Sequence, residues 1–177
     1  KVVPYCPRCG TPLSDHEVAL GYSEAIDPSV FVRLPLVEDP GTSLLIWTTT
    51  PWTLPGNVAV AAHPEIDYVI VERKMENNQP NHSEKLILAQ SLINKVFGDE
   101  PVQILHEFKG KQLKNTEYQP LYTFLPPDRP AHRVVLGDFV NIDDGTGLVH
   151  IAPAFGEDDM QVALEENLPV LMTVSPN

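Results

Sequence analysis

Eighteen prolines are spread along this chain of 177 residues, and they limit the length of any regular element that it can form. Proline has no backbone N–H group, and it disfavours a helical conformation in the residue before it. Because the prolines are scattered rather than clustered, they predict short strands separated by many turns and not a disordered proline-rich tract. With 42% hydrophobic residues, the chain is expected to form one globular domain with a core.

The periodicity of the apolar residues predicts where the strands and helices lie. We expect two strands within 17–37, the second of them over the alternating residues 29–37, and further strands over 42–50, 57–62, 67–73, 85–89, 102–108, 133–136 and 148–151. Helical spacing predicts short helices over 90–97 and 157–167, with a surface loop over 74–83 and an irregular stretch over 110–130. Many strands with a few short peripheral helices predict an α+β fold centred on a β-barrel.

Residues 47–57, with the sequence WTTTPWTLPGN, are the strongest sign of a ligand site. Three adjacent hydroxyls, Thr48, Thr49 and Thr50, follow an apolar strand and stand where Pro51 must end it. Threonine favours strands, so a threonine triplet can also be an ordinary strand end. A strand end crowded with hydroxyls, however, is better suited to binding a polyhydroxyl ligand such as a ribose than to forming a core.

A second segment, GTGLVHIAPAFGEDD over residues 145–159, ends a predicted strand near His150 and starts a helix with acidic residues. Taken alone, His150 could be a structural histidine, and Asp159 could be one of several carboxylates favoured by the helix dipole. The chain has no nucleophile motif such as Gly-x-Ser-x-Gly, no HExxH and no P-loop lysine. Its hydroxyls, histidine and acidic cluster instead fit the hydrolysis of an ester that is already activated, by positioning of water and substrate.

The charge and the cysteines limit the partners. A formal charge of −12 argues against binding an RNA backbone, although a pocket could still receive the end of an RNA held elsewhere. Cys6 and Cys9, the only cysteines, form half of a zinc knuckle; His16 is a candidate third ligand, and no fourth is evident. There is no apolar run long enough to span a membrane. The chain begins without Met or a signal peptide, so we expect a piece of a longer protein, such as an inserted domain.

The two segments occur in this order about a hundred residues apart, and together they resemble the editing (CP1) domain of isoleucyl-tRNA synthetase, a class I aminoacyl-tRNA synthetase. The resemblance covers residues 5 to 174 and is weakest between 73 and 133. Related editing domains for valine and leucine carry an arginine in the threonine-rich peptide. This chain has Thr50-Pro51-Trp52 there, which favours the isoleucine member of the family.

The resemblance implies a function for the chain. It also implies roles for residues in the threonine-rich segment and in the segment that ends with acidic residues. The expected activity is hydrolysis of misacylated valyl-tRNA(Ile), with valyl-adenylate as a further substrate, while isoleucine is excluded. Thr48, Thr49 and Thr50 would contact the terminal adenosine and the ester, and Asn57 would support hydrolysis from the edge of the pocket. These four residues are the expected catalytic set.

Three more residues are expected to bind substrate on the same grounds. Trp52 would pack against the site, and Asp159 would bind the α-ammonium group. His150 would limit the side-chain pocket so that valine enters and isoleucine does not.

The resemblance also implies an organisation and a set of partners. Residues 1–16 would be a zinc-knuckle-like connecting segment and 17–177 the editing domain. We expect no cofactor in the editing site, and zinc at Cys6 and Cys9 only with ligands from outside this chain. Expected partners are the valylated 3′ end of tRNA(Ile), valyl-adenylate and the rest of the parent synthetase; we expect a cytoplasmic monomer without a membrane partner. Two other classes stay open: a module that binds an aminoacyl-adenosine end without hydrolysing it, and a structural zinc-anchored domain.

Overall fold

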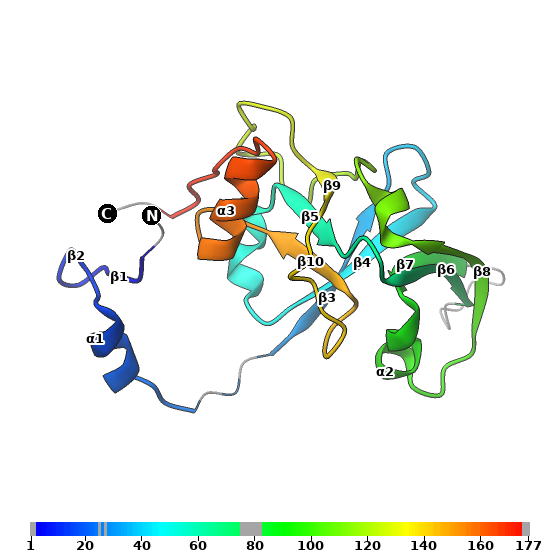
Figure 1. Cartoon of the computed structure of the whole chain (residues 1–177), viewed down its shortest axis with the longest axis horizontal. Helices are drawn as coiled ribbons and strands as arrows, with labels where there is room; N and C mark the ends of the chain where they lie inside the picture. Colours follow the sequence, from blue (N-terminus) through cyan, green and yellow to red (C-terminus); the bar gives the residue numbers. More distant parts are fainter. Residues whose placement is uncertain (1–2, 25, 27, 75–82, 175–177) are drawn as a thin grey trace.

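The computed structural model describes residues 3–24, 26, 28–74 and 83–174. Within these ranges the largest sheet has five strands in the order β3-β4-β7-β6-β8 (Figure 1). The strands are β3 (Val30–Pro35), β4 (Thr42–Thr48), β7 (Ser83–Ala89), β6 (Asp67–Lys74) and β8 (Val102–Lys109). All neighbours are antiparallel except β4 and β7, which run parallel.

A second sheet has three strands in the order β10-β5-β9. They are β10 (Leu148–Ile151), β5 (Ala59–Ala62) and β9 (Arg133–Leu136), and β5 pairs antiparallel with β10 and parallel with β9. A short hairpin near the N-terminus pairs β1 (Tyr5–Cys6) with β2 (Thr11–Pro12). The helices are α1 (Asp15–Leu20), α2 (Ile93–Phe97) and α3 (Glu157–Glu165), with 3-10 turns η1 (Pro51–Gly56), η2 (Gln90–Leu92) and η3 (Gly110–Leu113).

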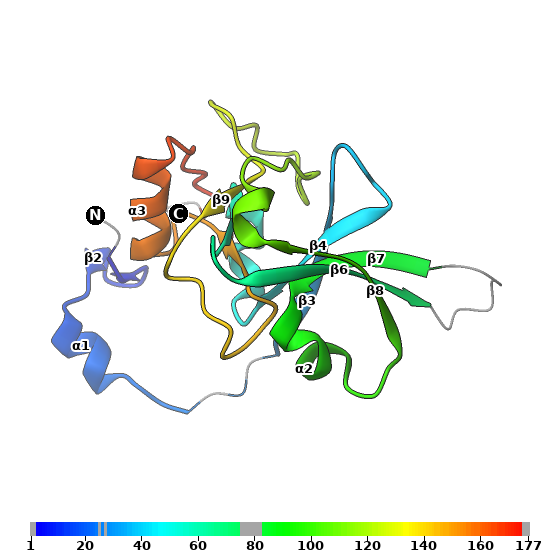
Figure 2. The same ribbon diagram turned by 45° about the vertical axis from the view of Figure 1, so that its right-hand side comes forward.

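The two larger sheets divide the core of the described residues. Figures 1 and 2 show α3 and the five-stranded sheet on opposite sides of the three-stranded sheet. One apolar cluster lies between the sheets and joins Leu44 and Ile46 of β4 to Val60 of β5 and Leu148 of β10. A second cluster packs the outer side of the three-stranded sheet against α3, and a third packs Leu45 and its neighbours against Phe97 of α2. The alternation along β4 therefore sends successive side chains to opposite faces of the sheet.

The α+β class is confirmed, but the β-barrel was wrong for the described residues. Both larger sheets are open, with β3 and β8 at the edges of one and β10 and β9 at the edges of the other. A backbone hydrogen bond of 2.8 Å from Ala89 N–H to Thr146 O links the sheets, but no strand ladder closes them. Each strand of the smaller sheet is only four residues long. The turn at Thr146 precedes β10, and Pro153 follows it.

Two further expectations change in the structure. The first of the two strands expected within 17–37 is wrong, because α1 covers residues 17–20 and the described residues from 21 to 29 form no strand. Ser14 caps this helix through a reciprocal pair of bonds with Glu17, the capping box that the sequence Ser-x-x-Glu encodes. The loop expected over 74–83 lies mostly outside the described residues. None of the helices that are described is long and apolar enough to cross a membrane.

Candidate functional site

A cavity of about 540 Å³ opens where the end of β4 meets the loop before β10 and the start of α3. It brings together Thr48, Thr49 and Thr50 with His150 and Asp159, five of the seven residues expected from sequence. The rest of its lining comprises Trp47, Thr53, Phe139, Asn141, Asp143, Asp144, Gly145, Thr146, Gly147, Leu148, Val149 and Phe155. Two segments that lie about a hundred residues apart in sequence therefore form one site.

The threonine loop is held by its own hydroxyls. Thr48 is buried, and its Oγ1 accepts a hydrogen bond of 3.0 Å from the backbone N–H of Thr50. Thr53 Oγ1 donates to the backbone carbonyl of Thr50 at 2.8 Å, which fixes the start of η1. These bonds turn the chain out of β4 and leave Thr49 and Thr50 exposed at the cavity, where their hydroxyls can contact a ligand.

His150 is a buried, neutral wall of the cavity. Its Nε2 lies 2.9 Å from Thr53 Oγ1. Because the Thr53 hydroxyl already donates to Thr50 O, it accepts here, and Nε2 carries the proton. Nδ1 is then an acceptor, and it has no hydrogen-bond partner among the described residues. Burial lowers the pKa of His150 to about 4, so the ring carries no charge at neutral pH.

Asp159 contributes a carboxylate to the other side of the cavity from the first turn of α3. Its Oδ2 accepts a hydrogen bond of 3.0 Å from the N–H of Ala152, which ties the helix to the residue that follows β10. Burial raises the pKa of Asp159, with Asp158 adding to the effect and the Ala152 bond opposing it. A partly desolvated carboxylate with one oxygen engaged is well placed to bind a cation with the other.

The electrostatic character of the cavity is acidic. Asp143, Asp144 and Asp159 line it, and no lysine or arginine stands among the described lining residues. Lys95 of α2 pairs with the Asp144 carboxylate from outside the lining, so Asp143 and Asp159 carry the unpaired negative charge. Such a cavity favours a cationic group such as an ammonium ion and disfavours a phosphate. With its threonine hydroxyls and neutral imidazole, it can bind an aminoacyl group attached to a ribose.

The structure places the two remaining expected residues elsewhere. Trp52 does not line the cavity, and 61% of its surface is exposed on η1. Asn57 is buried outside the cavity lining, where its Oδ1 accepts from Tyr118 Oη at 2.6 Å and its Nδ2 donates to Ala59 O at 2.9 Å. The described contacts give Asn57 a structural position behind the threonine loop, so its direct part in hydrolysis stays a prediction.

Several cavity residues were missed by reasoning from sequence. Trp47 and Thr53 lie inside the threonine-rich segment, and the alternation of β4 could have placed Trp47 on a different face from its neighbours. Gly147 was assigned only to a turn, yet at φ +73° it also brings the loop so near β7 that an added Cβ would lie 2.6 Å from Ala89 Cβ. Nothing in the sequence marks the rim residues Asn141, Asp143 and Asp144, since a polar loop carries no periodic pattern.

The cysteines stand apart from this site, on the β1–β2 hairpin. Cys6 and Cys9 are free thiols. Within the described residues, no group of three or more His, Cys, Asp or Glu side chains is arranged to hold a metal ion, and a role of His16 as third ligand stays a prediction. Zinc bound with the help of ligands from outside the chain stays a prediction.

Comparison with known proteins supports the sequence resemblance. The chain is 50% identical to isoleucine–tRNA ligase of Thermobifida fusca over 98% of its length, and 51% identical to that of Thermus thermophilus over 98%. It spans only 16% of the length of either relative. No protein-family model matches the chain.

Solved structures support the fold. The crystal structure of GlLeuRS-CP1 aligns with a TM-score of 0.62 at 17% identity, covering 79% of this chain and 61% of that one. The editing domain of the P. knowlesi cytosolic leucyl-tRNA synthetase aligns with a TM-score of 0.55 at 14% identity, covering 71% of this chain and 52% of that one. The chain is therefore homologous to a segment of the isoleucine–tRNA ligases, and it has the fold of leucyl-tRNA synthetase editing domains.

Proposed function

We propose that this chain is the editing domain of an isoleucine–tRNA ligase and that it hydrolyses the ester of valyl-tRNA(Ile). The observation that carries the proposal is the convergence of Thr48–Thr50, His150 and Asp159 on one acidic cavity. In this proposal, Asp159 binds the α-ammonium group, and the exposed hydroxyls of Thr49 and Thr50 bind the ribose and the ester. His150 limits the space for the amino-acid side chain.

Discrimination by size explains the need for such a site. A synthetic site that accepts isoleucine can reject valine only through one missing methylene, which in general is worth roughly 1–3 kcal/mol. A second site can instead exclude the larger amino acid by steric contact. The rigid, buried imidazole of His150, held by Thr53, is suited to that task because it cannot move away without losing its hydrogen bond.

The proposed mechanism depends on positioning. An aminoacyl ester is already activated, so hydrolysis requires water held near the carbonyl and donors near the developing oxyanion. The threonine loop provides hydroxyl donors beside the cavity. A neutral His150 favours this reaction, since a charged imidazolium would repel the ammonium group that Asp159 binds.

Valyl-adenylate is the second candidate substrate, and the charges of the cavity disfavour it. Its phosphate would face Asp143 and Asp159 without a lysine or arginine among the described lining residues, and the Lys95 side chain that pairs with Asp144 is already engaged. In the tRNA ester, by contrast, the amino acid is joined to the terminal ribose and carries no phosphate. We therefore propose the tRNA ester as the main substrate, with the rest of the parent synthetase gripping the body of the tRNA in the cytoplasm.

The function is tested by replacing Asp159 with Asn and measuring release of valine from valyl-tRNA(Ile). A hydrogen bond to a charged group is worth about 1.5–3 kcal/mol, which predicts a loss of roughly 10- to 150-fold in kcat/KM. Glu157→Gln is the matched control, because it removes one exposed charge from the same helical turn and should leave the rate unchanged. Equal rates for wild type and Asp159→Asn would refute the ammonium role, and binding without valine release would identify a binding module.

A further inference from the structure

One segment of the cavity wall is hydrogen-bonded to the rest of the domain by a single side chain. Residues 141–145 belong to the loop before β10, and all of them except Ile142 line the cavity. Lys95, in the last turn of α2, donates from Nζ to the backbone carbonyl of Asp143 and to Oδ1 of Asp144, both at 2.5 Å. Within the part of the chain that the structure describes, no other hydrogen bond joins 141–145 to a different element.

The two ends of this segment are fixed independently of Lys95. On one side, Val140 is buried in the apolar cluster that packs against α3. On the other side, the carbonyl of Thr146 accepts a backbone hydrogen bond of 2.8 Å from the end of β7, and the carbonyl of Gly147 accepts from the Tyr68 hydroxyl at 2.5 Å. The five residues between these points form no strand or helix, so the contact with Lys95 determines where they lie.

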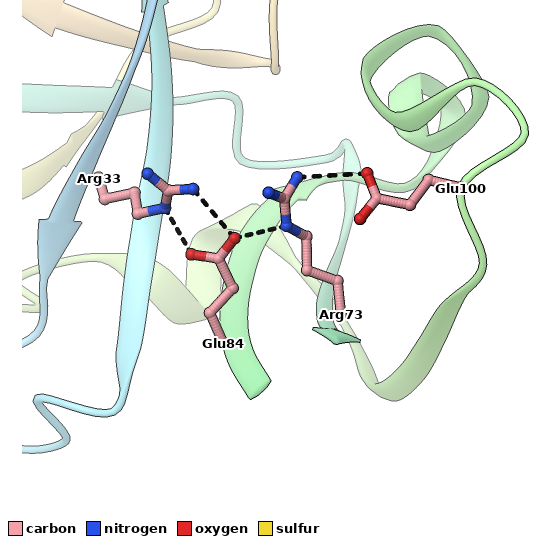
Figure 3. Close-up of polar contacts among 4 residues, drawn as sticks. All are labelled: Arg33, Arg73, Glu84 and Glu100. Atoms are coloured by element: carbon pink, nitrogen blue, oxygen red, sulfur yellow. Dashed lines mark hydrogen bonds and ion pairs between the residues drawn. The ribbon is translucent and has the colours of Figure 1, made fainter. Parts of the chain in front are cut away.

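The helix that carries this lysine is itself firmly placed. Phe97, at the end of α2, is buried against the larger sheet, and Arg73 of β6 lies over its ring at 5.8 Å from the centroid. Arg73 also pairs with Glu100, just after the helix. Figure 3 shows that Glu84 holds Arg73 in place and pairs with Arg33 of β3 as well. The four charges balance, so this network fixes the position of α2 without adding a net charge.

The ring of Trp47 lies under the same segment. Gly145 has a φ of +74° and stands so near the indole that an added Cβ would lie 2.9 Å from Cε3 of Trp47. The segment therefore rests on a ring that also lines the cavity. Release of the segment from Lys95 would expose this ring to solvent.

We propose that Lys95 is a positioning residue for the cavity and that it holds residues 141–145 in the arrangement that receives an aminoacyl-adenosine end. The inference rests on the proposed function, because that function supplies the ligand. A ligand that meets a wall already ordered does not have to supply the free energy of ordering it. Lys95 also neutralises Asp144, which leaves Asp143 as the unpaired charge of this segment.

The test separates the anchor from the charge. Lys95→Met combined with Asp144→Asn removes one positive and one negative charge, so the net charge is unchanged while the bond to the Asp143 carbonyl is lost. Calorimetric titration with non-hydrolysable valyl-adenosine 3′-amide should show about 2- to 12-fold weaker binding, the range expected for the loss of one hydrogen bond. Lys95→Arg can still donate to a carbonyl and a carboxylate, so it should bind the probe as wild type does.

The strand β8 offers a matched control. Lys109 Nζ donates to the backbone carbonyl of Glu65 at 3.0 Å and pairs with Asp67 at 2.8 Å, so it makes the same two kinds of contact as Lys95 but outside the cavity lining. Lys109→Met combined with Asp67→Asn should therefore leave probe binding unchanged. An equal loss of affinity in both double variants would reveal a general effect of removing an ion pair and would overturn the inference.

Fluorescence gives a readout that does not depend on the ligand. In a Trp52→Phe background, Trp47 is the only tryptophan of the chain. In the Lys95 double variant its quenching by acrylamide should increase and its emission should shift to longer wavelength, because residues 141–145 no longer cover the ring. The Lys109 double variant should show neither change.

The outcomes distinguish the inference from the function on which it rests. Unchanged quenching of Trp47 in the Lys95 double variant would mean that the segment has not moved, and it would overturn the anchor. Increased quenching with unchanged probe binding would overturn the positioning role and leave the proposed function intact. Failure of the probe to bind wild type would overturn the proposed function and the positioning role together.

Discussion

Burial of His150 predicts a specific dependence of stability on pH. The pKa of this imidazole is lowered from the ordinary 6.5 to about 4, because the ring is desolvated. Folding disfavours protonation of this neutral imidazole. Its contribution to stability is therefore complete above the pKa of the unfolded state, and it is lost as the pH falls through the pKa of the folded state. Because a tenfold change in proton affinity is worth about 1.4 kcal/mol, the loss attributable to His150 should approach 3 kcal/mol by about pH 4.

The assay is urea unfolding of wild type and of His150→Gln at several pH values between 8 and 4. Glutamine keeps an amide N–H that can reach Thr53 but does not titrate. Asp159, whose pKa is raised, and His132, whose pKa burial lowers, are present in both proteins and cancel in the difference. The free energy of unfolding of wild type should therefore fall by about 3 kcal/mol more than that of the variant over this pH range. A difference in stability that does not change with pH would refute the assignment of a buried, neutral His150.

Three further substitutions test how the cavity is built. Gly147→Ala should lower the free energy of unfolding by roughly 1–3 kcal/mol in urea, because it adds a Cβ at positive φ close to Ala89; unchanged stability would contradict this close approach. Asn57→Ala should cost about 1–3 kcal/mol by leaving the Tyr118 hydroxyl unpaired, and full stability with lost hydrolysis would instead support a direct catalytic role. Thr53→Val should destabilise the protein by a similar amount and relax the rejection of isoleucine, since it removes the acceptor for Nε2–H of His150; retained selectivity in analogue binding would argue against this positioning role.

Much of the site could be predicted because its residues lie in two compact segments. Pro51 ends β4 and the threonines follow at once, so local chain chemistry alone places three hydroxyls at a strand end. The convergence of His150 and Asp159 with these hydroxyls depends on β10 packing beside β4, which no local pattern encodes. It was expected only from the family resemblance.

The expectations from sequence that differ from the structure also have physical causes. The capping box at Ser14 outweighed the strand pattern that was expected after it. Asn57 is followed by a strand and lies near the hydroxyl segment, but its contact with Tyr118 joins residues 61 positions apart and could not be inferred from sequence. Closure into a barrel depends on whether edge strands meet, and the strand pattern is the same for open and closed sheets.

The most direct test of the account is the binding of non-hydrolysable valyl- and isoleucyl-adenosine 3′-amides to wild type and to His150→Ala. The account predicts that wild type binds the valyl compound and rejects the isoleucyl one. In His150→Ala the isoleucyl compound should bind, because the wall that excludes the extra methylene is gone. Equal binding of the two compounds to wild type would contradict the claim that this cavity discriminates by size.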